Sequence, residues 1–211
     1  MAMVTTSKQM IVEITEIVQR LLRQSGLEKR TAQIFTRKLP GETLGWVGLN
    51  RAINRGDGKL EVNPVIGLRH QRLESLVAEL IGLKDHPYIP PTISTPIGYL
   101  MPENSYVSWL FEPGENHSRE AQRMVQSITT YGYPFMSANN TLASLIDKML
   151  AGFGHPHQLK FRIPAAYLLV SETQMAEDCV NQELNALCGR DDAAADQYRA
   201  FAKAMFMQSV S

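Results

Sequence analysis

A glutamate-rich loop before an expected helix holds one candidate catalytic group. In the segment FEPGENHS, Glu112 and Glu115 precede His117. A carboxylate beside an imidazole can orient a general base, so these three residues are a candidate hydrolytic site. Asn116 or Ser118 acting as a helix cap explains the same polar composition without any chemistry. We favour the cap and expect no catalytic residue here.

His155 and His157 are the only close histidine pair in the sequence, and a proline separates them. Two imidazoles with a third ligand can hold a transition metal such as Zn²⁺. That ligand would have to be Asp147, Asp191 or Asp192, and each could reach the pair only if the chain folded back. We therefore expect neither a metal nor another cofactor.

The glycine-rich segment NRGDG (54–58) is a candidate ligand loop between two extended runs, 43–53 and 59–68. A phosphate-binding loop would have to lead into a helix, and a calcium loop needs more oxygen ligands than this segment offers. Gly56 and Gly58 can supply the positive φ that a tight turn requires. The pattern therefore predicts a β-hairpin.

Helices and extended runs alternate over most of the chain, and only helical patterns follow them. Apolar residues at spacings of three and four predict the helices, and extended runs beside Pro/Gly signals predict the strands. This order predicts an α+β fold with a mostly antiparallel sheet, flanking helices and a C-terminal helical bundle. We expect an α+β domain over 1–153 and a helical extension over 154–211 that packs on it.

The expected elements can be given in chain order. They are a helix between Ser7 and Gly26, a strand over 32–39, the hairpin over 43–68, a helix over 71–81, a second hairpin that pairs 97–102 with 106–112, helices over 118–131 and 141–153 joined by a tight aromatic linker (131–140), and helices over 164–170, 173–189 and 192–208.

The cysteines and the apolar runs bear on the compartment. Cys179 and Cys188 are nine residues apart on one expected helix, which separates them by ~13 Å at ~1.5 Å per residue. A disulfide needs Cα atoms within ~7 Å, so we expect two free thiols, which are typical of a reducing compartment. The N-terminus lacks the pattern of a signal peptide, and no run of about 18 apolar residues could span a membrane. These features predict a soluble, cytoplasmic protein without a membrane contact.

Charge is balanced over the whole chain but unevenly distributed. The 211 residues include 21 Lys+Arg and 21 Asp+Glu, so the chain lacks the basic excess with which nucleic-acid-binding proteins neutralise phosphate. Residues 1–72 have a net charge of 12 − 6 = +6, and residues 73–211 have 9 − 15 = −6. We therefore expect a charged protein partner and no direct contact with nucleic acid.

The acidic C-terminal region is the predicted partner-binding site, because seven carboxylates accompany the single base Arg190 between residues 172 and 196. A broad acidic surface accelerates association with basic partners. A competing interpretation is that these acids contact the chain's own basic N-terminal third, or that of a second copy in a homodimer. The predicted partner-binding residues are Glu172, Glu177, Asp178, Glu183, Asp191, Asp192 and Asp196, and the competing contact would use Arg20, Arg23, Lys29 and Arg30.

Several segments, taken in order, give the chain a family likeness. IFTRKLPG precedes the long hairpin, WLFEPGEN leads into a helix, YGYPF precedes the next helix, and PAAYLLVSETQMAEDCVNQELNAL (164–187) lies in the C-terminal helical part. This layout resembles small bacterial domains of unknown function that are counted among the immunity proteins of polymorphic toxin systems. The resemblance implies a cytoplasmic binding protein that neutralises a cognate toxin by occlusion, and the expected partner is a basic toxin domain.

The sequence contains no G-x-S-x-G, H-E-x-x-H or P-loop signature, so we expect a binding protein and no enzyme. Two alternatives stay open. One is a small hydrolase or metal-dependent enzyme that uses His117 with Glu112 and Glu115, or His155 with His157. The other is a structural subunit that associates with itself through its opposite charges.

Overall fold

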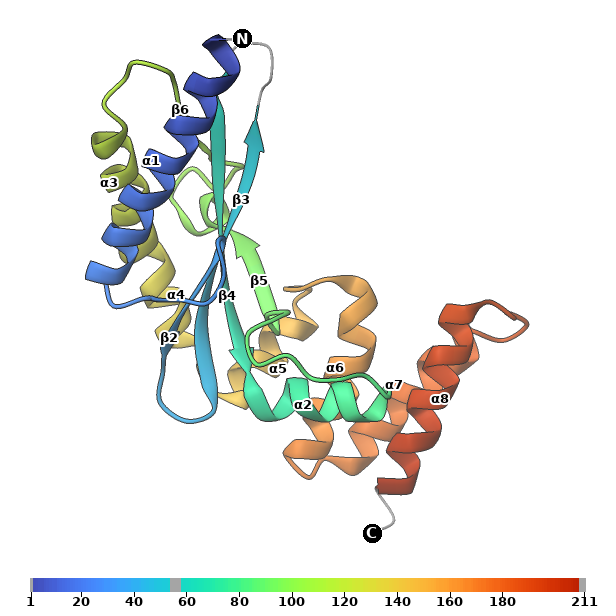
Figure 1. Cartoon of the computed structure of the whole chain (residues 1–211). Helices are drawn as coiled ribbons and strands as arrows, with labels where there is room; N and C mark the ends of the chain where they lie inside the picture. Colours follow the sequence, from blue (N-terminus) through green and yellow to red (C-terminus); the bar gives the residue numbers. More distant parts are fainter. Residues whose placement is uncertain (1, 54–57, 209–211) are drawn as a thin grey trace. The chain divides into compact units, whose positions relative to one another are not determined.

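The computed structural model describes residues 2–53 and 58–208, and the chain forms two compact units (Figure 1). No helix in these residues has the length and apolar content of a membrane span. Unit 1 comprises Met1–Leu39, Leu44–Leu68 and Ser94–Ala138, and unit 2 comprises Pro40–Thr43, Arg69–Ile93 and Asn139–Ser211.

Six strands in the described residues form one open antiparallel sheet. Neighbours follow the order β1-β2-β3-β4-β5, and β6 also pairs with β4. The register places the buried side chains of Phe35 and Val47 opposite each other, and likewise Val62 and Trp109. Together with the helices, this sheet confirms the predicted α+β class. The strands are β1 (Glu28–Lys29), β2 (Ile34–Lys38), β3 (Thr43–Ile53), β4 (Leu60–His70), β5 (Ile93–Pro96) and β6 (Trp109–Phe111).

β3 and β4 are the two strands predicted on either side of the NRGDG segment. They are neighbours in the sheet, as the hairpin prediction requires. Gly58 has a φ of 70°, which glycine adopts without steric strain. The predicted strands are therefore confirmed, whereas residues 54–57, including Gly56, lie outside the described residues.

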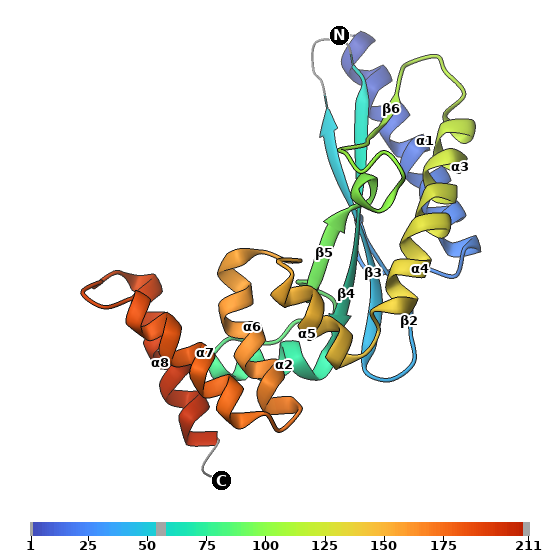
Figure 2. The ribbon, with the colours of Figure 1, turned by 180° about the vertical axis from the view of Figure 1, so that it is seen from behind.

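Three helices of unit 1 lie on one face of the sheet: α1 (Ala2–Gln24), α3 (His117–Ser127) and α4 (Tyr133–Ala138). α1 and α3 are side by side in Figure 1, and the view from behind in Figure 2 agrees. The two helices can pack together because apolar residues recur along α1 at spacings of three and four, as the sequence predicts. The buried stripe of α1 includes Met10, Ile14, Val18 and Leu22.

The chain between α3 and α4 stays helical, so the prediction of a linker over 131–140 is wrong. A π turn (Ile128–Gly132) joins the two helices, and the Tyr133 N–H donates to the Ile128 carbonyl. Pro134 has no N–H, so it interrupts the regular ladder of hydrogen bonds at this point. A single wider turn accommodates such an interruption without ending the helix.

The second predicted hairpin, between 97–102 and 106–112, is also wrong. The strand before residue 97, β5, ends at Pro96, which has no N–H with which to continue the ladder. A 3₁₀ turn (Ile97–Leu100) follows, and β6 pairs with β4 instead.

The helices of unit 2 pack around α6. This helix contacts α2, α5, α7 and α8, and Figure 2 shows the chain turning after α7 so that α8 runs back along it. The rings of Tyr198 and Phe201 on α8 lie 5.3 and 5.0 Å from that of Phe161 on α6. The predicted C-terminal helical bundle is thus confirmed. The helices are α2 (Gln71–Leu80), α5 (Leu142–Leu150), α6 (Pro156–Leu169), α7 (Thr173–Ala186) and α8 (Ala193–Gln208).

α6 starts at Pro156 and not at residue 164 as predicted. Pro156 occupies the first turn, where a missing N–H leaves no helical bond unmade. Pro164 lies inside the helix, so the Lys160 carbonyl loses its intrahelical donor. The Tyr198 hydroxyl donates to this carbonyl at 3.4 Å, so α8 supplies the bond that the proline cannot make.

We expect Tyr198→Phe to lower the free energy of unfolding by ~1 kcal/mol, because the half-buried Lys160 carbonyl then loses this donor. Pro164→Ala restores the intrahelical N–H, so the same substitution should cost less in that background. Urea unfolding of the four proteins measures both effects. An equal loss of unfolding free energy in the two backgrounds would show that the hydroxyl does not stabilise the protein through the Lys160 carbonyl.

Candidate functional site

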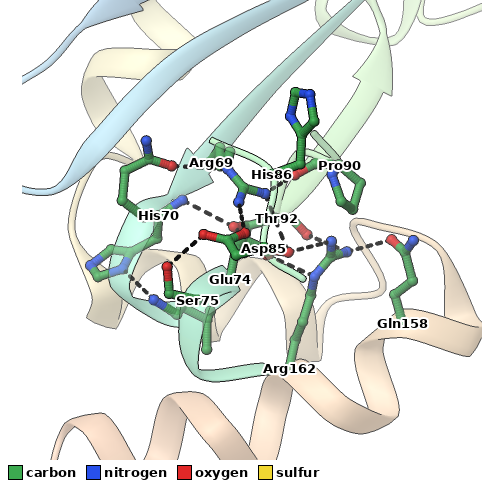
Figure 3. A network of polar contacts seen from close by, with 12 residues as sticks. Arg69, His70, Glu74, Ser75, Asp85, His86, Pro90, Thr92, Gln158 and Arg162 are labelled. Carbon is green, nitrogen blue, oxygen red and sulfur yellow. Dashed lines mark hydrogen bonds and ion pairs between the residues drawn. The ribbon is translucent and has the colours of Figure 1, made fainter. Parts of the chain in front are cut away.

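A buried carboxylate on α2, that of Glu74, is the centre of a polar network in unit 2 (Figure 3). Arg162 of α6 holds it at two points, with Nε 2.8 Å from Oε1 and Nη2 2.9 Å from Oε2. The Thr92 hydroxyl donates to Oε1 at 2.7 Å. Glu74 is 5% exposed and Arg162 is 2% exposed, so this ion pair is almost completely withdrawn from water.

A second buried guanidinium, that of Arg69 at the end of β4, joins the network. Its Nη1 is 3.7 Å from the Glu74 carboxylate, and its Nη2 donates to Asp85 Oδ1 at 2.7 Å. Nη1 also donates to the Pro90 carbonyl at 2.6 Å. The Ser75 hydroxyl donates to the other oxygen of Asp85 at 2.6 Å. Arg69 therefore ties the connector between α2 and β5 to the end of β4.

The four charged side chains balance one another, with two guanidinium groups and two carboxylates. A buried charge is tolerated only when it is paired and fully hydrogen-bonded. Burial lowers the pKa of Arg69 below its ordinary value, and the carboxylates of Glu74 and Asp85 oppose that shift. No buried side-chain nitrogen or oxygen in the described residues lacks a partner. This balance makes the network a structural element of unit 2.

His70 connects the network to the start of α2. Its Nδ1 accepts the Leu73 N–H at 3.2 Å as the helix cap, and its backbone N–H donates to the Thr92 hydroxyl at 3.0 Å. Burial lowers the pKa of His70, and the nearby carboxylates of Glu42 and Glu74 partly oppose this shift. The capping nitrogen must be unprotonated to accept a hydrogen bond, so burial and capping favour the same neutral form.

A pocket of about 350 Å³ lies beside this network, inside unit 2. It lies between α2, the connector that follows it and the first turns of α6. Arg69, Glu74 and Arg162 form part of its lining, together with apolar side chains. A concave apolar pocket with a few placed polar groups is the usual form of a small-molecule site.

Sequence reasoning missed this network. Arg69 and Glu74 lie far along the chain from Arg162, so no local pattern joins them. The available signal was weaker: Arg69 ends the apolar run VIGL, and Arg162 lies between apolar residues in the FRIPAAYLLV segment. A charge at an inward position of an apolar run indicates a buried ion pair but does not identify its partner.

The residues proposed for a His/Glu site lie in unit 1. His117 is buried, with Nδ1 3.3 Å from Glu13 Oε1 and Nε2 3.0 Å from the backbone carbonyl of Glu112. The Glu112 carboxylate instead pairs with Lys59 at 2.7 Å. Asn116 accepts the Arg119 N–H and caps α3, as the cap interpretation requires.

The second histidine pair lies at the start of α6. His155 is the residue before the helix, and its ring centroid is 5.4 Å from that of His157. Among the described residues, no group of three or more His, Cys, Asp or Glu side chains is arranged to hold a metal ion. The described cysteines, Cys179 and Cys188, are free thiols.

The seven predicted acidic residues lie directly before α7, on α7, on the turn after it and on the first part of α8. Three of them pair with cations of unit 2: Glu183 with Lys160 at 3.6 Å, Asp192 with Arg190 at 2.8 Å, and Asp196 with Arg199 at 2.9 Å. The Asp192 carboxylate also accepts the N–H groups of the first turn of α8. Its bond with Arg190 and these N–H groups lower the pKa of Asp192.

Comparison of the chain with protein-family models, with curated proteins and with solved structures finds no match.

We expect Glu74→Gln to lower the free energy of unfolding by ~3–5 kcal/mol, because it leaves two buried guanidinium groups with one carboxylate. Glu79→Gln on the same helix is the control. Glu79 is exposed, so its substitution should change stability by less than ~0.5 kcal/mol. Guanidinium chloride unfolding measures both, and similar values for the two variants would contradict the structural role of the network.

His70 should make the stability of the protein depend on pH. Because its pKa is lowered in the folded state, the unfolded chain takes up the proton first as the pH falls. The stabilising contribution is therefore complete above the unfolded pKa of ~6.5 and is lost progressively below it. His70→Asn keeps a capping oxygen and cannot be protonated. We expect the variant to lose less stability than the wild type between about pH 7.5 and pH 5.5, and identical losses would contradict this assignment.

Proposed function

We propose that the protein binds a basic protein partner through the acidic surface of α7 and of the turn between α7 and α8. The main observation that supports this proposal is that four of the seven predicted carboxylates form no ion pair with another described residue. Such carboxylates direct their field into solvent, where it can attract a basic partner. They are Glu172, Glu177, Asp178 and Asp191.

An apolar groove on the same pair of helices supports a protein as the partner. The groove has a volume of about 730 Å³. Met207, near the end of α8, is 69% exposed. Protein interfaces combine an apolar centre, which holds a few large anchoring side chains, with a charged rim. The lining consists of Leu184, Arg199, Ala202, Lys203, Phe206 and Met207.

The partner that we propose is a toxin, and the protein is then an immunity-type inhibitor that acts in the cytoplasm by occlusion. A toxin that cleaves or modifies nucleic acid carries a basic surface, because it must hold phosphate. Carboxylates on α7 complement that surface. The resemblance in layout to immunity proteins of polymorphic toxin systems supports the same role, which requires no catalytic group.

The test measures how fast the partner associates with the protein. The partner is captured from the native host with the tagged protein, identified by mass spectrometry and purified. A triple variant, Glu177→Lys with Asp178→Lys and Asp191→Lys, should slow association by ~10-fold or more at low salt. Its melting temperature should stay that of the wild type. Glu183 is left unchanged because it pairs with Lys160.

The matched control changes the net charge by the same amount in unit 1, with Glu16→Lys, Glu103→Lys and Glu115→Lys. All three residues are exposed. We expect this control to slow association by less than ~3-fold, through its effect on net charge alone. Equal effects of the two triple variants would show that the acidic surface of α7 is not the contact. Recovery of only a second copy of the chain would favour a self-associating subunit.

A further inference from the structure

We propose that the pocket beside the Arg69–Glu74–Arg162 network binds a small amphipathic carboxylate, which has an apolar body and one anionic head. This site is separate from the acidic surface of α7. It would give unit 2 a ligand in addition to a protein partner.

The size and walls of the pocket suit an apolar body. Its volume of about 350 Å³ falls within the range of small-molecule sites. Val77 and Phe161 line its inner part and are both 8% exposed. Transfer of a hydrocarbon chain from water to such walls is favourable by ~25 cal/mol per Å² of buried apolar area. The apolar lining residues are Val77, Ala78, Ile81, Leu83, Ile89, Pro90 and Phe161.

The carboxylates in the lining are already occupied, so they do not favour a cationic ligand. Glu74 is held at two points by Arg162 and accepts a third bond from Thr92. Asp85 is held by Arg69 and Ser75. A ligand ammonium group would have to displace one of these donors. The three lining cations, Arg69, Lys84 and Arg162, outnumber the two carboxylates, so the net formal charge of the lining is +1.

The donors for an anionic head are at the exposed part of the lining. Lys84, His86 and His157 are all exposed and all line the pocket. His86 uses Nδ1 to accept the Tyr88 N–H. The first turn of α6 contributes His157 and Gln158, so the positive end of a 14-residue helix adds to the field there. These groups would hold the carboxylate at the mouth while the apolar body enters.

The experiment uses the full chain and two probes with the same hydrocarbon chain, octanoate with an anionic head group and octanamide with a neutral one. Isothermal titration calorimetry, with NMR to locate the shifted resonances, measures both affinities. We expect octanoate to bind with a dissociation constant below ~1 mM, and at least ~10-fold more tightly than octanamide. Lys84→Gln with His157→Gln should bring the two affinities to within ~2-fold of each other, because the head group then loses the Lys84 ammonium group and the His157 imidazole as partners.

A matched pair of substitutions locates the site. Leu83 lines the pocket and is 60% exposed, and Leu150 on α5 is 57% exposed and does not line it. Leu83→Asp places a negative charge at the mouth and should weaken octanoate binding by at least ~10-fold. Leu150→Asp adds the same charge elsewhere in unit 2 and should change the affinity by less than ~2-fold. Both positions are exposed, so both variants should fold.

Three results would overturn the proposal. Absence of octanoate binding at ~10 mM would show that the pocket is not a ligand site for this chemistry. Equal affinities for octanoate and octanamide in the wild type would show an apolar cavity that does not recognise an anion. Equal effects of Leu83→Asp and Leu150→Asp would place the binding elsewhere. None of these results bears on the protein partner, which is tested by association kinetics.

Discussion

The two-point ion pair between Glu74 and Arg162 is the constraint on which the rest of unit 2 depends. It joins two helices whose paired residues are 88 positions apart in the sequence, and both side chains are almost completely buried. A buried charge without its partner is strongly destabilising. α2, α6 and the connector that carries Thr92 must therefore be in place together. The pocket and the packing of the helices around α6 follow from that requirement.

Elements with a local cause could be predicted from the sequence. The apolar spacing of α1 and the two extended runs that became β3 and β4 are periodic within a few residues, so the pattern alone was sufficient. Elements that depend on contacts with residues far away in the sequence could not be predicted in this way. Pro134 and the proline of the HPH segment indicate a break in the chain, yet a π turn and a helix start accommodate them. Only the folded chain shows these compensations.

The same distinction applies to the charged residues. Composition shows that the acidic residues cluster in one segment, but it could not show which carboxylates the protein uses internally. Glu183 is engaged by Lys160, a residue outside that segment, and Asp192 caps the helix that follows it. The Arg69–Glu74–Arg162 network could not be predicted from the sequence for a related reason. Each of its members is an isolated charge in its own segment, and only tertiary structure brings them together.

The bond between Tyr198 and the Lys160 carbonyl has a consequence for how the sequence can evolve. With proline at position 164, the Lys160 carbonyl receives the bond that it loses within the helix only while position 198 carries a hydroxyl. An ancestor with another residue at 164 could lose the hydroxyl at position 198 and keep a buried aromatic ring there, whereas in a chain with Pro164 that loss removes the donor to the Lys160 carbonyl. The order of substitutions therefore matters, since the proline must be replaced before the tyrosine is lost. Among relatives of this chain, the two positions are expected to vary together.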